Sequence, residues 1–508
     1  MGGGAYNKLR MQKSMHVKKR YTFWMIGESM TYISLNYYIL VIAVLLIYYC
    51  LPLKTRWVAL LVGNIVFYIR FYKTGWWIFA GTIIVSYLEG LFMQKVNGKL
   101  KKITLLISVL SITVPWILIK NSNFVIGDVL KRDPIYWIIP LGISFYTLQL
   151  LSYVIDVYLN KIIPEKNIAK YALYASFFPQ LVQGPIPRYN QLQSQLIEGH
   201  KFDEEKIVKG FCYIIWGFFL KLVIADKAGV VVNTVFNNYP AYSGAYIWLA
   251  SFLYSIQLYA DFLACTTLAQ GVAKMFGIDL VDNFSRPYFA TSIKDFWRRW
   301  HISLSTWLRD YIYIPLGGNR KGTFRKYINL IITFIVSGIW HGAGFRFLIW
   351  GGMHAFYQIV GELTYDLREN CYFRLKIDKN SKKKKMLKQC GTFLLVNWAW
   401  IIFRADSLWL GSRMIKHMFT EFNPWIFFND RIFTLGLGWK EMMVLFFAIG
   451  LLWKVGKYHE EGKSVSDKVM NQILPIRWAI YMISIIVIMV FGTYGFGFNA
   501  QDFIYGGF

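Results

Sequence analysis

Long apolar runs alternate with short, basic polar segments along most of this 508-residue chain. The runs cover residues 37–51, 57–69, 76–84, 103–119, 207–225, 246–263, 393–403, 442–453 and 480–491. A helix needs about 20 apolar residues to cross a bilayer, so the shorter runs predict tilted or broken helices. With a helical pair around residue 341, the pattern predicts about 11 membrane passes plus re-entrant or interfacial helices.

Composition favours a membrane protein over a soluble one. Hydrophobic residues make up 56% of the chain and aromatic residues 19%, and the mean hydropathy is +0.37. Charged residues make up 17%, whereas roughly 25% is usual in soluble domains. No segment is long enough to fold alone in water, and no repeat of fixed period is found. The predicted fold is all-α and polytopic, with a basic N-terminal tail (residues 1–32) and one transmembrane domain (residues 33–508).

The positive charge narrows the choice of partners. The formal net charge is +28, and the basic residues cluster in loops between apolar runs. Basic loops stay on the cytoplasmic side of a membrane, beside anionic lipid headgroups. Residues 374–388 hold eight basic residues against Asp378 alone and predict a cytoplasmic loop. The loops of the first half, such as residues 95–102, leave its orientation open. Because no basic patch lies on a soluble domain, nucleic acid is not an expected partner.

The sequence gives little support for metal or disulfide chemistry. Five cysteines are scattered without a CxxC spacing, and no Gly-rich phosphate loop, nucleophile elbow or HExxH helix is present. His301 and His341 have no carboxylate or cysteine at ligand spacing. We therefore expect no metal and no bound cofactor.

Two segments break the pattern of simple membrane helices. Residues 177–187 contain three prolines and one glycine in apolar sequence, which predicts a kinked or re-entrant segment near a central pocket, or else a surface loop. In residues 295–319, Trp297, Trp300, Leu304 and Trp307 follow helical spacing. This stripe predicts an amphipathic helix at the membrane interface or at a cavity mouth, or a simple anchor without chemistry.

His341 is the strongest candidate for chemistry. It is one of seven histidines and lies between apolar segments, where a titratable group is costly to keep. The alternative is a buried histidine satisfied by a backbone carbonyl. Asp156, Asp261, His301 and Arg404 also interrupt apolar sequence, and together they could line a polar pocket. The chemistry that fits is a general base that deprotonates a hydroxyl as it attacks an activated acyl carbon, in a site that excludes water.

Several motifs carry a resemblance to a known family. The most specific are Trp-Arg-Arg-Trp-His at residues 297–301 and Ile-Trp-His-Gly at residues 339–342. The others lie at residues 140–147, 152–158, 178–186, 283–288, 307–319, 403–405 and 503–505. In this order and spacing, the chain from about residue 33 to its end resembles the membrane-bound O-acyltransferases, specifically their alginate O-acetylase-like bacterial branch.

The resemblance implies a cup of membrane helices around a narrow tunnel. His341 matches the catalytic histidine of the family, and His301 matches a second histidine that shapes the tunnel. Support around the tunnel is expected from Trp297, Arg298, Arg299, Trp300, Asp310, Asn319, Asp261 and Trp340. The implied donor is a cytosolic acyl thioester, acetyl-CoA or a similar molecule. The implied activity is O-acetylation of an extracellular polysaccharide, in the bacterial cytoplasmic membrane and with an extracytoplasmic SGNH-type partner protein that accepts the acyl group.

One departure from the family pattern leaves alternatives open. Where the family has Asp-Phe-Ser-Gly-Tyr followed by Ser or Thr and then Asp, this chain keeps Asp261 but has Ala264, Cys265 and Thr267. The lost carboxylate and ring could change the acceptor or weaken activity. The alternatives are D-alanyl transfer to teichoic acid, a transporter or flippase of a lipid-linked glycan, and a non-catalytic scaffold.

Overall fold

The computed structural model describes residues 32–71, 75–130, 132, 133, 135, 137–242 and 244–494. Within these residues all regular structure is helical, which confirms the predicted all-α class. The predicted tail, residues 1–32, lies outside the described residues except for Tyr32.

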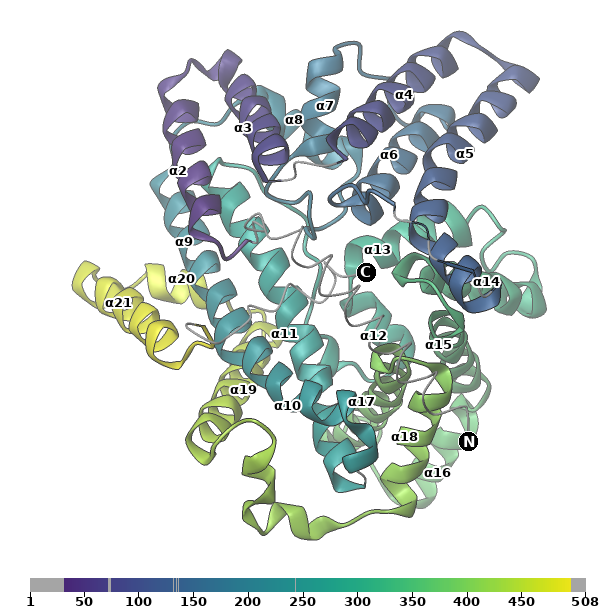
Figure 1. Ribbon diagram of the computed structural model, residues 1–508, viewed down its shortest axis with the longest axis vertical. Coiled ribbons are helices and arrows are strands. Elements are labelled where there is room, and N and C mark those ends of the chain that lie inside the picture. Colours follow the sequence, from purple (N-terminus) through teal and green to yellow (C-terminus); the bar gives the residue numbers. More distant parts are fainter. Residues whose placement is uncertain are drawn as a thin grey trace.

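The first group of helices forms one side of the molecule, at the top of Figure 1. Its members are α2 (Leu35–Cys50), α3 (Arg56–Phe71), α4 (Trp76–Lys95), α5 (Gly98–Asn123), α6 (Ile143–Tyr158), α7 (Ile168–Ser176) and α8 (Tyr189–Glu198). All residues of α6 except Ile155 and Tyr158 are buried, whereas α5 buries five of its positions. The group therefore faces the molecule's centre with α6 and lipid with α5.

The central helices are α9 (Glu204–Phe218), α10 (Asp226–Asn237) and α11 (Ala245–Met275), and the π-helical turn η3 (Phe219–Ala225) joins α9 to α10. α9 packs closely on α11 because a glycine lies on each helix at the crossing. A Cβ atom on Gly210 would lie 2.6 Å from the carbonyl oxygen of Gly271, so a larger residue does not fit there. α11 lies near the centre of Figure 1 and is the interior helix, since 83% of the residues in its most apolar 18-residue stretch are buried.

The remaining helices lie on the right and at the bottom of Figure 1, except α20 and α21, which lie on the left. They are α12 (Ile293–Arg299), α13 (Ile302–Leu308), α14 (Gly322–His341), α15 (Phe345–Leu363), α16 (Tyr365–Arg374), α17 (Lys382–Arg404), α18 (Leu408–Thr420), α19 (Trp439–Glu460), α20 (Val465–Met470) and α21 (Leu474–Phe491). Only Tyr481 and Ile488 of α21 are buried, so this helix is peripheral and suited to lipid.

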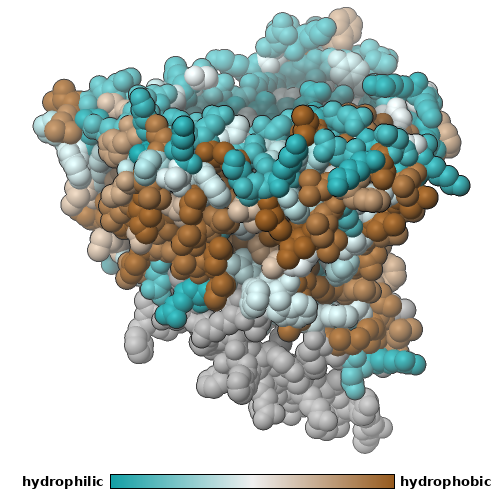
Figure 2. Space-filling view, turned by 90° about the horizontal axis from the view of Figure 1, so that it is seen from above, coloured by the Kyte–Doolittle hydropathy of each residue, from teal (hydrophilic) through white to brown (hydrophobic). Residues whose placement is uncertain are grey.

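Among the residues that the structure describes, six helical stretches are long and apolar enough to cross a membrane, which confirms a multi-pass membrane protein. They are Trp76–Lys95, Gly98–Gly127, Glu204–Asn237, Ala245–Met275, Lys382–Arg404 and Leu474–Phe491. Figure 2 shows the outer surface that this produces, a broad apolar band with a hydrophilic band along one edge. The count of about eleven passes stays a prediction.

The structure corrects two sequence expectations. Residues 295–319 do not form one amphipathic helix, because the chain breaks at Trp300 and His301 between α12 and α13. Backbone hydrogen bonds from Ser285 to Arg299 (2.9 Å) and from Ile302 to Asn283 (2.9 Å) hold this break. The basic stretch 374–388 is not all loop either, because its lysines from Lys382 onward lie in the first turns of α17.

The structure supports one of the two interpretations of residues 177–187. Their backbone forms turns rather than a helix, yet nearly all of them are buried. A surface loop is excluded, and the predicted kink is confirmed. The backbone N–H of Ile186 donates to the Ser303 hydroxyl (3.0 Å), so this segment supports the break between α12 and α13.

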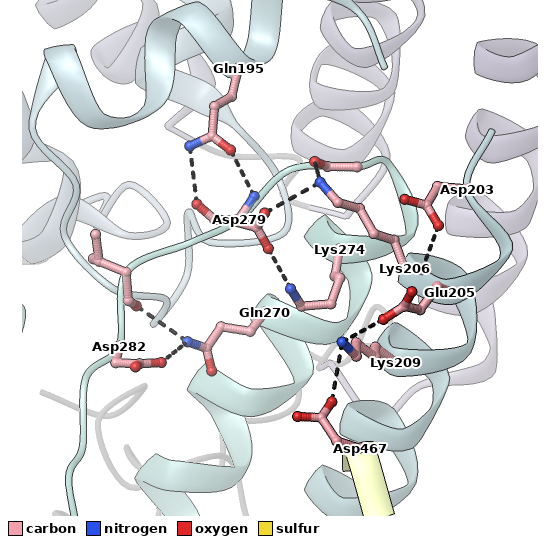
Figure 3. Close-up of polar contacts among 12 residues, drawn as sticks. Gln195, Asp203, Glu205, Lys206, Lys209, Gln270, Lys274, Asp279, Asp282 and Asp467 are labelled. Atoms are coloured by element: carbon pink, nitrogen blue, oxygen red, sulfur yellow. Dashed lines mark hydrogen bonds and ion pairs between the residues drawn. The ribbon is translucent and has the colours of Figure 1, made fainter. Parts of the chain in front are cut away.

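The ends of many helices meet on one strongly basic face. Polar contacts join Lys206 at the start of α9 to Asp279 after α11, and Lys209 to Asp467 on α20, as Figure 3 shows. Further contacts along this face are Lys101–Asn160, Lys326–Glu362, Arg286–Glu460, Arg299–Glu460 and Gln389–Phe289. The α4–α5 loop, whose orientation the sequence left open, lies on this basic face together with the start of α17, which the sequence assigns to the cytoplasmic side.

Candidate active site

His341 is the last residue of α14, and two close helix contacts fix its position. A Cβ atom on Gly338 would lie 2.3 Å from the carbonyl oxygen of Phe347, and one on Gly351 would lie 2.3 Å from that of Phe334. The absence of side chains at both glycines lets α14 and α15 pack backbone to backbone. As a result His341 is 2% exposed although it lies at a helix end.

Aromatic rings surround the His341 imidazole. The ring centroid of Trp340 lies 4.8 Å away, that of Trp350 4.9 Å and that of Phe403 5.5 Å, and all three meet the imidazole edge to face. These rings come from α14, α15 and α17. Three helices therefore enclose the imidazole in an apolar, water-poor environment of the kind that acyl transfer requires.

His301 sits at the break between α12 and α13 and is fully buried. Its backbone has φ = 45°, in the left-handed region, and this turns the chain from one short helix into the next. The side-chain oxygen of Asn283 accepts from the Ser303 N–H (3.1 Å) and hydroxyl (2.8 Å) and lies 3.2 Å from Nδ1 of His301. Because this oxygen can only accept, Nδ1 of His301 carries the proton, and the lone pair of the neutral ring lies on Nε2.

Trp340 connects the two histidines, which are far apart in the sequence. Its indole lies 4.8 Å from the His341 ring and 5.6 Å from the His301 ring, centroid to centroid. The indole N–H donates to the backbone oxygen of Ser144 on α6 (3.0 Å), so the ring cannot rotate away without losing that bond. The structure therefore brings the predicted residues His341, His301 and Trp340 into one cluster.

Two further residues belong to this cluster and escaped the sequence analysis. His354 on α15 is fully buried, accepts a hydrogen bond from the Trp297 indole (Nε1 to Nδ1, 3.2 Å) and packs on Trp350 at 5.0 Å. Lys120 on α5 donates to the backbone oxygen of Trp340 (3.3 Å). His354 had the same sequence signal as His341, an imidazole within an apolar run. Lys120 directly follows an apolar run and had no such signal.

The Trp-Arg-Arg-Trp motif before His301 lies partly in the interior and partly at the surface. Trp297 and Trp300 are buried, and Trp300 packs on Trp400 at 5.1 Å. Arg298 is exposed, and Arg299 binds Asp295 and Glu460 at 2.9 Å each. The tryptophans thus lie in the interior, whereas the arginines lie on the basic face.

The other predicted support residues lie apart from the histidines. Asp310 pairs with Arg309 (2.8 Å) and Arg188 (3.7 Å), and Asn319 is exposed on the turn before α14. Asp261 on α11 is buried and binds Lys221 (2.8 Å), which also binds Asp226 (2.9 Å). Asp261 precedes Phe262, whose ring lies 4.7 Å from the His301 ring, so this buried ion triad supports the wall behind His301.

Among the described residues, no group of three or more His, Cys, Asp or Glu side chains is placed to hold a metal ion. The arrangement instead offers a buried imidazole enclosed by rings, next to a second imidazole of fixed tautomer. Such a pair can accept a proton from a hydroxyl and orient the group that the hydroxyl attacks.

Comparison with known proteins points to the same chemistry. Residues 160–386 match the membrane-bound O-acyltransferase family. Probable alginate O-acetylase AlgI of Pseudomonas putida is 34% identical over 397 residues, covering 75% of this chain and 78% of that protein. Peptidoglycan O-acetyltransferase of Helicobacter pylori is 35% identical, covering 56% and 58%. Teichoic acid D-alanyltransferase of Bacillus subtilis is 33% identical, covering 42% and 57%.

Proposed function

The chain belongs to the membrane-bound O-acyltransferase family and is an O-acyltransferase, and on this premise we propose that it moves an acetyl group across the bacterial cytoplasmic membrane. The donor is a cytosolic acyl thioester, acetyl-CoA or a similar molecule, and the final acceptor is a hydroxyl of an extracellular polysaccharide. The similarity to alginate O-acetylases over three quarters of the chain supports acetyl transfer over D-alanyl transfer.

The proposed reaction breaks the carbon–sulfur bond of the thioester and forms a carbon–oxygen bond to the acceptor. His341 takes the proton from the attacking hydroxyl and returns it to the departing thiolate, so protons balance over one turnover. His301, with its proton on Nδ1, shapes the tunnel beside Trp340. The enclosing rings of Trp340, Trp350 and Phe403 keep water from competing for the acyl group.

The distribution of charge supports the direction of transfer. Lysine and arginine gather on the basic face, which the positive-inside rule assigns to the cytosol. α14 starts at this face, where Lys326 pairs with Glu362, and its 20 residues span about 30 Å before they end at His341. A donor that enters from the cytosol must therefore insert its acyl arm deeply. The exposed Arg298, together with Asp310 and Asn319, lies on the side from which such a donor arrives.

The observation that carries the proposal is the buried cluster of His341, Trp340 and His301. The experiment that tests it is mass spectrometry of cell-surface polymers from cells that express the wild-type chain, His341→Ala or, as a control, His459→Ala. His459 lies near the end of α19, close to the basic face. We expect the acyl mass to disappear with His341→Ala at unchanged expression and to persist in the control. Equal acylation with His341→Ala would falsify the role of His341.

The same experiment separates the alternatives. An added mass of alanine on teichoic acid would replace acetyl transfer with D-alanyl transfer. Loss of the polymer itself from the surface, rather than of its acyl groups, would indicate a transporter of lipid-linked glycans. The proposed SGNH-type partner and the eleven membrane passes need their own tests, by affinity capture from the membrane and by cysteine labelling of the loops.

A further inference from the structure

A cavity of about 730 Å³ lies on the basic face, apart from the histidine cluster. One wall is formed by residues 200–208, which lead into α9 and form its first turn, and the other by Met470 of α20 and Arg477 of α21. Beside the cavity, the ion pair between Lys209 and Asp467 (3.2 Å) joins α9 to α20, as Figure 3 shows. None of the residues that line the cavity belongs to the histidine cluster, so its ligand has to be inferred from its own walls.

The α21 wall of the cavity carries a cation, Arg477. Among the described residues, its side chain makes no hydrogen bond and no ion pair within 4.0 Å, although its Nε atom is buried. A guanidinium is always charged, and a buried donor without an acceptor costs free energy. Since this side chain also lines the cavity, it indicates a ligand that accepts hydrogen bonds and carries negative charge.

The α9 wall has the opposite charge. Two of its charged residues are already paired, Glu205 with Lys209 (2.8 Å) and Lys206 with Asp279 (3.4 Å). Of the others, Asp203, Glu204 and Lys201 make no ion pair within the described part of the chain. This wall therefore presents two carboxylates against one ammonium, and it faces a guanidinium that is too far away to pair with either carboxylate. A ligand that carries a negative and a positive group matches both walls.

The cavity lies at the depth where lipid headgroups meet the hydrocarbon. Arg477 is near the start of α21, and the residues that follow it, Trp478, Met482 and Ile483, are apolar and exposed. An exposed tryptophan at this point is typical of the membrane interface. Phe202, on the other wall, is exposed as well. A phospholipid can therefore place its headgroup in the cavity while its acyl chains lie along α21.

We propose that this cavity binds the headgroup of a phospholipid that carries both a phosphate and a free ammonium group. The Arg477 guanidinium binds the phosphate through charge-assisted hydrogen bonds, and Asp203 and Glu204 bind the ammonium from the other wall. The headgroup thereby joins the peripheral helix α21 to α9. The site involves neither His341 nor the acyl donor and goes beyond the proposed function.

The test is native mass spectrometry of the purified full-length protein in detergent with one of three added phospholipids. Phosphatidylethanolamine has both groups, phosphatidylglycerol lacks the ammonium, and the methylated ammonium of phosphatidylcholine has no N–H to donate. The wild type should retain phosphatidylethanolamine best. Arg477→Gln should weaken that binding about tenfold, whereas Arg374→Gln, an exposed arginine at the end of α16, should not change it.

A second variant tests the acidic wall. Asp203→Asn with Glu204→Gln removes both carboxylates, and Asn still caps α9 as Asp203 does. We expect this variant to lose the preference for phosphatidylethanolamine and to keep its binding of phosphatidylglycerol. Thermal unfolding of each variant in detergent alone checks that it is folded.

The outcomes separate a lipid headgroup from other sources of phosphate. Equal retention of the three lipids by the wild type, or a preference that both site variants keep, overturns the proposal. Displacement of the lipid by soluble acetyl-CoA would assign Arg477 to the acyl donor and would overturn it too. His341→Ala should bind phosphatidylethanolamine as the wild type does. If the wild type acylates no surface polymer yet shows the lipid preference, the proposed function fails and the headgroup site stands.

Discussion

The two histidines of the cluster are held by different means. His301 lies in a chain break and is fixed by Asn283, whose oxygen also holds Ser303. His341 lies at the end of a regular helix and is fixed by the packing of three aromatic rings. The hydrogen bond to the Asn283 side-chain oxygen fixes which nitrogen of His301 is protonated, and the packed rings fix the place of the His341 imidazole. We propose that His341 exchanges a proton during acyl transfer, whereas His301 keeps its tautomer.

The strongest test of this comparison replaces each imidazole by an amide. We expect His341→Gln to lower the acyl-transfer rate about 10²–10⁴-fold, because an amide cannot act as a general base. His301→Gln keeps a donor for Asn283 and should cost less. The measurement is acylation per molecule of purified protein, with thermal unfolding as the control for folding. Equal losses for the two variants would remove the distinction between the base and its neighbour.

The next largest effect is expected behind His301, in the buried ion triad. Lys221→Met leaves Asp226 and Asp261 buried without their cation, which costs about 3–5 kcal/mol. The triad lies next to Phe262, so the loss should destabilise the wall of the His301 site more than that of His341. The matched control is Lys274→Met at the partly exposed end of α11, where the pair with the half-exposed Asp279 contributes about 0–1 kcal/mol. Comparable melting temperatures for both variants would show that the triad does not stabilise the fold.

A smaller effect is expected from the hydrogen bonds of Asn283. Asn283→Ala removes one acceptor from the Ser303 N–H, the Ser303 hydroxyl and the His301 ring. Leaving buried donors without a partner costs about 1–3 kcal/mol. We expect kcat to fall with little change in the donor KM, because His301 loses its orientation rather than a substrate contact. Asn283→Asp keeps an oxygen at this position and should retain more of the rate; equal rates for both variants would contradict a positioning role.

Much of the fold could be predicted from the sequence because the hydropathy of a segment determines whether it forms a membrane helix. The apolar runs at residues 103–119 and 246–263 became α5 and α11, since a bilayer accepts only helices there. The prediction of one amphipathic helix over residues 295–319 was wrong for a physical reason. Their spacing is helical, but the helix ends at Trp300 because residues 283–285, in the segment before α12, make backbone hydrogen bonds to Arg299 and Ile302. The spacing of apolar residues indicates a local helix preference and carries no information about such tertiary hydrogen bonds.

Parts of the candidate site could be predicted from the sequence. His341 and His301 stood out because imidazoles are costly in apolar sequence. That Trp340 lies between them depends on the packing of α14 against α6, through the bond from its indole to Ser144, which no local pattern encodes.

The smallest expected effect lies outside both histidine sites and sets the baseline of the comparison. Glu369 on α16 binds Lys384 (2.6 Å) and Lys388 (2.9 Å), and these lysines lower the pKa of its carboxyl to about 2. A lowered acid pKa stabilises the folded form above the unfolded value near 4.5, and this stability is lost as the pH falls from there toward 2. Because the carboxyl is partly exposed, the pair contributes about 1 kcal/mol or less, and salt weakens it further. Hydrogen exchange of the α16–α17 junction should therefore rise in Glu369→Gln at pH 6 and low salt, and hardly differ from wild type in high salt. The acyl-transfer rate of Glu369→Gln should equal that of the wild type. A loss of rate as large as that of Asn283→Ala would show that the basic face and the histidine cluster are coupled, and Glu369→Gln would then no longer serve as the reference for the two histidine sites.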